Sequence, residues 1–201
     1  MSTQPKTFLT PEQYLDIERK AEYKSEYYRG EMFAMAGASL AHNTLVANLI
    51  GEFHGKLRAG PCRVLPSDMR VRVTSTGLYT YPDVVVVCGE PRVLDNQMDT
   101  LLNPSVLVEV LSPSTEDYDR GRKFEQYQSI ESLREYLMLA SDRVHADLYT
   151  RQPDGCWLLT SATRLEDSLD LQSVGCSLAL AGLYEKIDFP EPVSTATEPR
   201  Q

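Results

Sequence analysis

Two acidic residues and one lysine occupy positions from which their side chains can share a chemical task. Asp83 follows Pro82 at the start of an apolar run, Glu109 lies inside a second apolar run, and Lys123 lies in the polar segment after it. An unpaired carboxylate in an apolar interior costs several kcal/mol. Glu109 therefore requires a charged partner.

Divalent metal chemistry would explain this pattern. If the two apolar runs are adjacent central strands, Asp83 and Glu109 come within a few ångströms and raise each other's pKa unless a cation lies between them. Mg²⁺ or Mn²⁺ would resolve the conflict, because such ions prefer carboxylate and carbonyl oxygens. The backbone carbonyl of Val110 would supply a third oxygen. Lys123 could then position an attacking water and stabilise charge on a phosphate, which is chemistry suited to phosphodiester hydrolysis.

The segments around these residues predict the elements that would hold them. Residues 84–87 are continuously apolar, and residues 106–111 are apolar apart from Glu109. Both patterns are typical of strands buried on both faces of a sheet. The segment that follows predicts a helix over roughly 116–130, and this helix would have to return Lys123 to the end of the strand.

The rest of the chain predicts further helices and strands. A capping box at Thr10 and Gln13 predicts a helix over about 11–22. The turn residues Arg29-Gly30 predict a hairpin, and helically spaced apolar residues from Ser39 predict a long helix that Gly60-Pro61 ends. Other expected elements are strands at 69–75, 135–140, 144–150 and 156–162 and a short helix near 179–186.

This order of elements predicts the α/β (α+β) class, with a mixed sheet flanked by helices. We expect one domain over residues 1–189. Residues 190–201 are rich in Pro and Thr, so we expect them to be disordered.

The composition and charge of the chain argue against several classes of protein. The chain has 201 residues and a formal net charge of −9, which counts against non-specific nucleic-acid binding through bulk charge. No apolar run approaches the ~20 residues of a membrane span, and the N-terminus lacks the apolar stretch of a secretory signal.

The cysteines predict a reduced protein. Cys62, Cys88, Cys156 and Cys176 are far apart, and no two form a CxxC pair. We therefore expect neither a thiolate metal site nor a disulfide framework. Reduced thiols are typical of cytoplasmic proteins, so we expect a cytoplasmic location.

Several segments together resemble a known family. "YPDVVVV", "LVEVLSPST" and "DRGRKFEQY", with "EYYRGEMFAMAGASLAH" and "PSDMRVRV", are similar to the Uma-type restriction endonuclease family within the PD-(D/E)XK nuclease superfamily. The similarity covers roughly residues 8–189. It implies a restriction-endonuclease-like fold in which Asp83 is the "PD" aspartate and Glu109 the acidic residue of the second motif. Leu111 stands where the simple superfamily pattern has lysine, and in this family the lysine has moved to the following helix, here Lys123.

The resemblance adds two more candidates. Superfamily members often carry an N-terminal acidic residue that touches the metal or its water. Glu26 matches that residue best, and Glu31 is the alternative. His42 lies at the start of the long helix, where it could contact a phosphate or a nucleobase.

Each candidate also has a structural alternative. Glu109 could form a buried salt bridge to Arg70 or Arg72, and Glu26 could form one within the hairpin. Asp83 could be an ordinary strand-start aspartate. Lysines on helices are commonly solvated, and a lone histidine near an apolar helix face is commonly structural.

The sequence thus predicts a Mg²⁺-dependent (or Mn²⁺-dependent) endodeoxyribonuclease. Its metal ligands would be Asp83, Glu109 and Val110, with Lys123 and Glu26 as further catalytic residues and His42 at the substrate. We also expect a homodimer, because cutting both strands of a duplex is easiest with two sites. The alternative is a catalytically inactive nuclease-fold module that binds nucleic acid or protein.

Overall fold

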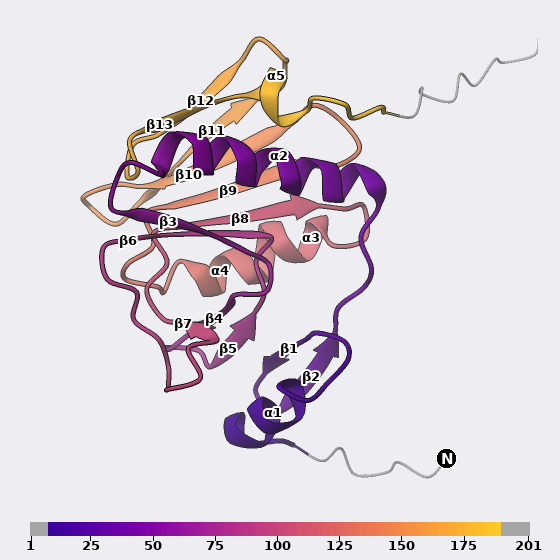
Figure 1. Ribbon diagram of the computed structural model, residues 1–201, viewed down its shortest axis with the longest axis vertical. Helices are drawn as coiled ribbons and strands as arrows, with labels where there is room; N and C mark the ends of the chain where they lie inside the picture. The colour runs from indigo at the N-terminus through magenta and orange to yellow at the C-terminus, as the bar shows by residue number, and fades with distance from the viewer. Residues whose placement is uncertain (1–7, 190–201) are drawn as a thin grey trace, which may run out of the picture.

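The protein is described by a computed structural model covering residues 8–189 (Figure 1). Its largest sheet has six strands in the order β11-β10-β9-β8-β6-β3. In that order they are β11 (Trp157–Ala162), β10 (Ala146–Arg151), β9 (Glu135–Ala140), β8 (Val106–Leu111), β6 (Val84–Cys88) and β3 (Cys62–Pro66). Strands β8 and β9 are parallel and the other neighbours are antiparallel, so the sheet is mixed.

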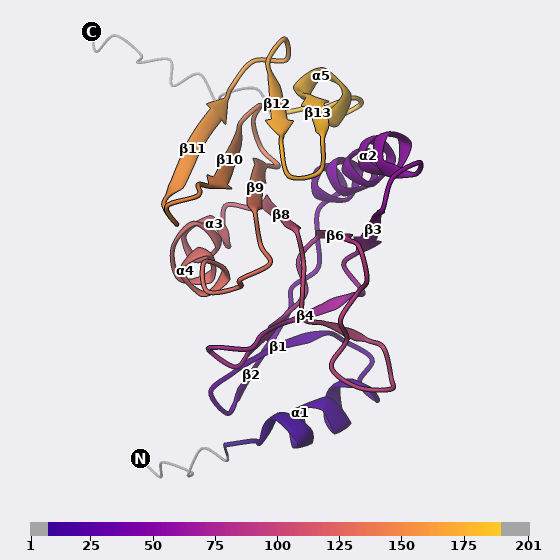
Figure 2. The ribbon, with the colours of Figure 1, turned by 90° about the vertical axis from the view of Figure 1, so that its left-hand side faces the viewer.

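A second sheet has five strands in the order β2-β1-β5-β4-β7. They are β2 (Glu31–Ala34), β1 (Ser25–Tyr28), β5 (Leu78–Thr80), β4 (Arg70–Val73) and β7 (Thr100–Leu101). With α1 (Pro11–Glu18), the β1–β2 hairpin lies at the opposite end of the molecule from the hairpin of β12 (Ser168–Leu171) and β13 (Cys176–Ala179) and from α5 (Leu180–Leu183) (Figure 2).

Helices cover both faces of the six-stranded sheet. Helix α2 (Leu40–Leu57) begins after Ser39, whose hydroxyl accepts a hydrogen bond from the His42 amide, and buries Leu45 and Phe53 in a core with the even-numbered residues of β6 and β8. The opposite face carries α3 (Glu116–Tyr118), the π-helical turn η1 (Asp119–Lys123) and α4 (Phe124–Tyr127). These helices pack against the odd-numbered residues of β6 and β8, against Tyr136 and Met138 of β9, and against β4 and β5.

The structure confirms the fold class and most of the expected elements. The hairpin turns at Arg29 and Gly30, both with positive φ. The first helix ends at Glu18 instead of near residue 22. The helix expected over 116–130 is interrupted by the π-helical turn, and five short strands were not anticipated: β3, β5, β7, β12 and β13.

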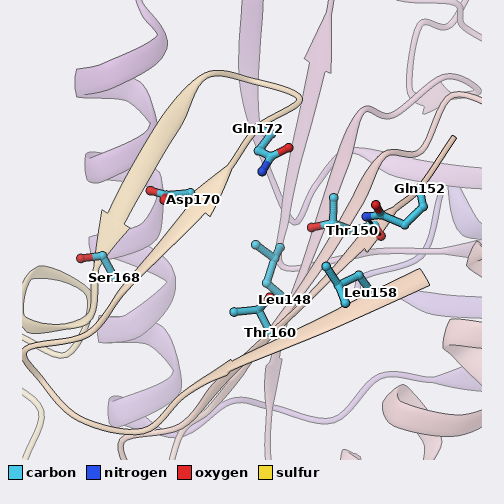
Figure 3. Close-up of a pocket in the computed structure, with 8 residues that line it drawn as sticks. All are labelled: Leu148, Thr150, Gln152, Leu158, Thr160, Ser168, Asp170 and Gln172. Carbon is cyan, nitrogen blue, oxygen red and sulfur yellow. Dashed lines mark hydrogen bonds between the residues drawn. The ribbon is translucent and has the colours of Figure 1, made fainter. Parts of the chain in front are cut away.

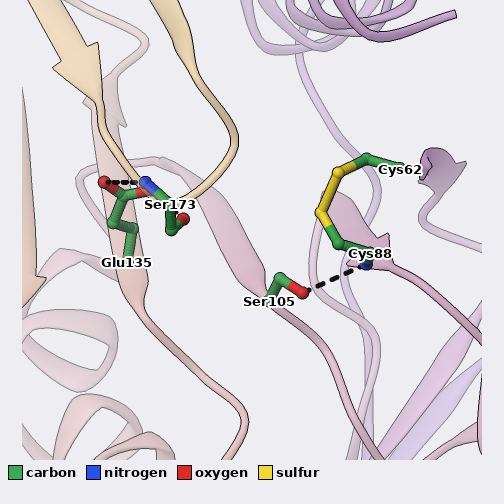
Figure 4. The surroundings of a disulfide bond; sticks show 5 residues. All are labelled: Cys62, Cys88, Ser105, Glu135 and Ser173. Carbon is green, nitrogen blue, oxygen red and sulfur yellow. Dashed lines mark hydrogen bonds between the residues drawn. A yellow bond between two sulfur atoms is a disulfide. The ribbon is translucent and has the colours of Figure 1, made fainter. Parts of the chain in front are cut away.

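The prediction for the cysteines was wrong. Cys62 of β3 and Cys88 of β6 are paired across the sheet and joined by a disulfide, with the Cys88 amide donating to the Ser105 hydroxyl (Figure 4). This pairing could not be predicted from the sequence, because the two cysteines are 26 residues apart and strand β3 was not expected. Cys156 and Cys176 are free thiols.

Two remaining predictions concern the ends of the chain and the membrane. None of the helices in the described part is long and apolar enough to cross a membrane. The disorder expected for 190–201 lies outside the described residues.

Candidate active site

Strand β8 places Glu109 on the face of the sheet that η1 and α4 cover. Leu107 and Leu111, two residues to either side, belong to the apolar core on that face, so Glu109 replaces an apolar side chain there. Val84 of β6 pairs with Val108 of β8. Asp83 immediately precedes β6, its carboxylate accepts a hydrogen bond from the amide of Val110, next to Glu109 in the chain, and its charge acts on Glu109.

Lys123 approaches Glu109 from the π-helical turn. Its ammonium Nζ lies 3.0 Å from Oε1 of Glu109, 3.2 Å from Oε1 of Glu26 and 3.3 Å from Oδ1 of Asp119. Lys123, Glu109 and Asp119 are each 4–5% exposed. The carboxylates of Glu109, Glu26 and Asp119 and the ammonium of Lys123 are called the carboxylate cluster below.

Hydroxyl groups fix the carboxylates in place. The Tyr127 hydroxyl donates to Oε1 of Glu109 over 2.8 Å, and the Thr80 hydroxyl donates to Oε1 of Glu26. Tyr136 donates to the backbone carbonyl of Asp119 over 3.2 Å. Because Thr80 is in β5 and Glu26 in β1, both sheets contribute side chains to one site.

Asp83 is not part of the carboxylate cluster but lies beside it, and its side chain is more exposed than that of Glu109. Its Oδ2 accepts a hydrogen bond of 2.7 Å from the Val110 amide and lies 3.3 Å from Nε2 of His42. The side chains of both Asp83 and His42 are 16% exposed. Nδ1 of His42 is buried without a hydrogen-bond partner in the described part of the chain.

The electrostatics of the site reflect an excess of negative charge. Burial, together with the charges of Asp119 and Asp83, raises the pKa of Glu109 well above its usual range. Burial also raises the pKa of Asp119. Burial alone would lower the pKa of Lys123, but the charges of Glu109, Glu26 and Asp119 outweigh it and raise that pKa well above its usual range. The site therefore holds its lysine charged and favours a further cation.

The donor set fits a hard divalent cation. Among residues 8–189, no group of three or more His, Cys, Asp or Glu side chains is arranged to hold a metal. Two carboxylates and one carbonyl suffice for Mg²⁺, which usually keeps several waters. In the same residues the hydrogen bonds and ion pairs of Glu109 run to Oε1 and those of Asp83 to Oδ2, which leaves one oxygen of each for a cation.

The structure brings together the candidates that the sequence suggested, although their catalytic roles remain predictions. Glu26 of the hairpin reaches Lys123, and His42 reaches Asp83. The alternative partners proposed for Glu109 are engaged elsewhere. Arg70 bonds to the Tyr81 hydroxyl and pairs with Asp99, and Arg72 lies over the ring of Tyr79.

Sequence reasoning missed three members of the site: Asp119, Tyr127 and Thr80. The spacing of Asp119 and Lys123 is compatible with a helical ion pair, but that spacing also occurs on solvated helix faces. Tyr127 is an aromatic residue packed among apolar core side chains, and Thr80 belongs to a strand of three residues, which is too short for a periodic signal.

Comparisons with known proteins agree with this architecture. The Uma2 family model, described as "Putative restriction endonuclease", matches residues 11–181. A solved structure from Anabaena variabilis ATCC 29413, described as "a putative nuclease belonging to DUF820", has a TM-score of 0.72 and 14% identity over 88% of this chain and 97% of that chain. This likeness shows a shared fold.

Two relatives from Synechocystis sp. (strain ATCC 27184 / PCC 6803 / Kazusa) match by sequence. "Uncharacterized protein slr1290" is 39% identical over 90% of this chain and 94% of its own length. "Uncharacterized protein sll1609" is 38% identical over 76% of this chain and 86% of its own length. The resemblance seen in the motifs is confirmed, and the chain belongs to the Uma2 family of restriction endonuclease-like proteins.

Proposed function

We propose that the protein is a divalent-metal-dependent endonuclease that hydrolyses phosphodiester bonds in DNA. Family and fold support a nuclease. The observation that carries the proposal is the convergence of Glu109, Lys123 and Glu26 at 3.0–3.2 Å, beside Asp83 on the neighbouring strand. A buried site with four carboxylates and one ammonium has the charge that attracts Mg²⁺ and the amine that phosphate chemistry needs.

Each side chain has a distinct task in this proposal. Asp83, Glu109 and the Val110 carbonyl would hold Mg²⁺ or Mn²⁺, which when bound neutralises phosphate charge and makes water more acidic. Lys123 would orient the attacking water, and Glu26, with Oε1 at 3.2 Å from the ammonium, would assist it. Tyr127, through its hydrogen bond, keeps Glu109 in the rotamer that faces Lys123.

His42 is proposed to contact the substrate. Its Nε2 faces Asp83, and its Nδ1 has no protein partner in the described residues. Because Nδ1 is buried, the imidazole would have to rotate for one of its nitrogens to meet a phosphate oxygen or a nucleobase edge. His42 would thus bind DNA next to the residue that holds the metal.

One observation favours the second candidate function, a nuclease-fold binding module without catalysis. An ammonium has three hydrogen-bond donors, and three carboxylates lie within 3.3 Å of Nζ of Lys123. Lys123 could orient a water only by giving up one of these contacts, and the contact with Asp119 is the longest. In the binding module, Lys123 would instead stay paired with these carboxylates.

A cleavage assay separates the two functions. We expect the wild-type protein to cut duplex, single-stranded or branched DNA with Mg²⁺ or Mn²⁺ and to be inactive in EDTA. Asp83→Asn and Glu109→Gln remove ligand charge with little change in shape, so both should reduce the cleavage rate by at least about a hundredfold.

Glu135→Gln is the matched control for this assay. Glu135 is a fully buried carboxylate on the neighbouring strand β9, and it bonds to Ser173 away from the cluster (Figure 4). This variant should cleave at the wild-type rate. If the folded wild-type protein cuts none of these substrates or RNA with either metal, catalysis is excluded and the binding module stands.

Two further features belong to the proposal. We propose a homodimer, because two copies of one site would serve the two strands of a duplex. Light scattering of the purified protein tests it, and a mass of one chain at micromolar concentration would contradict it. The cytoplasmic location stays a prediction from the sequence. The Cys62–Cys88 disulfide weakens it, because disulfides are rare in reducing compartments.

A further inference from the structure

Two cavities outside the carboxylate cluster differ in their chemistry. The first, of about 270 Å³, lies between β10–β11 and the β12–β13 hairpin, and its lining is mostly uncharged (Figure 3). The second, of about 360 Å³, has two arginines in its lining, the half-buried Arg72 and the exposed Arg92. It is called the arginine pocket and is lined by Arg72, Thr74, Ser75, Arg92, Leu102, Ser129, Ile130, Glu131 and Ser132.

The two arginines of this pocket form no close ion pair with the residues that the structure describes, although the charge of Arg72 helps to lower the pKa of the carboxyl of Glu12. Neither Arg72 nor Arg92 forms an ion pair with any residue in the range 8–189, and Glu131 is the single acidic residue in the lining. Arg72 has its Nε buried without a hydrogen-bond partner in that range, while its guanidinium lies 5.3 Å from the centre of the Tyr79 ring. Stacking holds the planar group, and an unsatisfied buried donor is costly unless a ligand or water meets it.

The polar groups nearby are arranged to tolerate an anion. The end of α4 would present carbonyl oxygens, which repel anions. Here the Ser129 hydroxyl donates to the Gln126 carbonyl and the Arg151 guanidinium donates to the Gln128 carbonyl. Burial lowers the pKa of Arg151, and the positive charge of Arg134, two residues after Ser132 in the chain, lowers it further. The protein as a whole is acidic, so this concentration of positive charge is local.

The position of the pocket relates it to the proposed site. Val71 of β4 pairs with Thr80, which bonds to Glu26 in the cluster. Thr74 of the pocket is the first residue after β4, three residues beyond Val71 in the chain. One strand therefore connects the pocket to the neighbour of Thr80.

We propose that the arginine pocket binds a phosphate group of a nucleic acid strand whose reacting phosphate lies at the carboxylate cluster. Arg72 and Arg92 would donate to the phosphate oxygens, and the hydroxyl of Thr74 would add a neutral donor. The phosphate chemistry rests on the pocket alone. The assignment of that phosphate to a nucleic acid strand rests on the proposed function.

The first test uses inorganic phosphate and isothermal titration calorimetry. The wild-type protein should bind phosphate, and Arg92→Gln and Arg72→Gln should each weaken binding at least about tenfold through loss of a charged donor. Arg72→Lys keeps the charge and loses the planar fork, so it should retain an intermediate affinity. Arg58→Gln, an exposed arginine at the end of α2, is the matched control and should bind normally.

The second test measures DNA binding in EDTA, where no cleavage occurs. Arg72→Gln and Arg92→Gln should weaken DNA binding and each reduce the slope of log K against log salt by about one, whereas Arg58→Gln should not. If phosphate binding by both variants equals that of wild type, the pocket assignment is overturned while the nuclease proposal stands. Phosphate binding that depends on Arg72 with unchanged DNA affinity would assign the pocket to a free phosphorylated molecule and overturn the strand assignment.

Discussion

Lys123 and Glu109 form a buried ion pair with 3.0 Å between Nζ and Oε1, and each residue is at most 5% exposed. This ion pair explains why an apolar strand can carry a glutamate. A cation and a hydroxyl group compensate the free-energy cost of burying its carboxylate. Here the cation is Lys123 and the hydroxyl belongs to Tyr127. The same ammonium also serves Glu26 and Asp119, so one lysine links both sheets to the π-helical turn.

Loss of the Lys123 charge should therefore destabilise the fold. Lys123→Met leaves three carboxylates in the interior without their shared cation. Removing one partner of a buried pair typically costs about 3–5 kcal/mol, so we expect the free energy of unfolding in urea to fall by about that amount. Lys56→Met is the control, because Lys56 pairs with Glu52 on the surface of α2, where such pairs contribute about 0.5 kcal/mol. Equal effects of the two substitutions would contradict the buried pair.

The raised pKa of Glu109 predicts a specific dependence of stability on pH. The folded state binds this proton more tightly than the unfolded state, whose pKa is about 4.3. Tighter proton binding by Glu109 therefore stabilises the folded state fully at pH values below the unfolded pKa. This stabilisation is lost as the pH rises through the pKa that Glu109 has in the folded state. The raised pKa of Lys123 contributes a constant amount throughout the neutral range, because its unfolded value is about 10.4.

Glu109→Gln should consequently remove part of this pH dependence. Measured by urea unfolding in EDTA, wild type should lose stability relative to the Gln variant as pH rises above about 4.3. If the difference in free energy of unfolding between the two proteins is constant from about pH 4 to about pH 9, the pKa of Glu109 is the same in the folded and unfolded states. That result would contradict the burial argument.

The disulfide predicts a loss of stability under reducing conditions. A closed loop of this size, with the cysteines 26 residues apart, is expected to stabilise the folded state by about 3–4 kcal/mol. Dithiothreitol should lower the free energy of unfolding accordingly, and a Cys62→Ser/Cys88→Ser variant should show the reduced value without it. Cys156→Ser/Cys176→Ser should respond to dithiothreitol as wild type does. A wild-type protein that is insensitive to the reductant would contradict a bond in solution.

The site was more predictable from the sequence than the details of the fold around it. Glu109 and Asp83 stood out because burial of charge is expensive, and two apolar runs fixed their strands. Asp119 could not be recognised, because its spacing of four residues from Lys123 also occurs on solvated helix faces. The Cys62–Cys88 bond could not be recognised either, because it depends on the register of β3 against β6.

The most direct measurement is the melting temperature as Mn²⁺ or Mg²⁺ is added. A ligand that binds the folded state stabilises it by an amount that grows with the logarithm of its free concentration over Kd and reaches about 2.7 kcal/mol at a hundred times Kd. We predict a rise for wild type and for the Glu135→Gln control, and no rise for Asp83→Asn or Glu109→Gln. No rise in the wild type, or an equal rise in Asp83→Asn, would contradict a metal site between these two carboxylates.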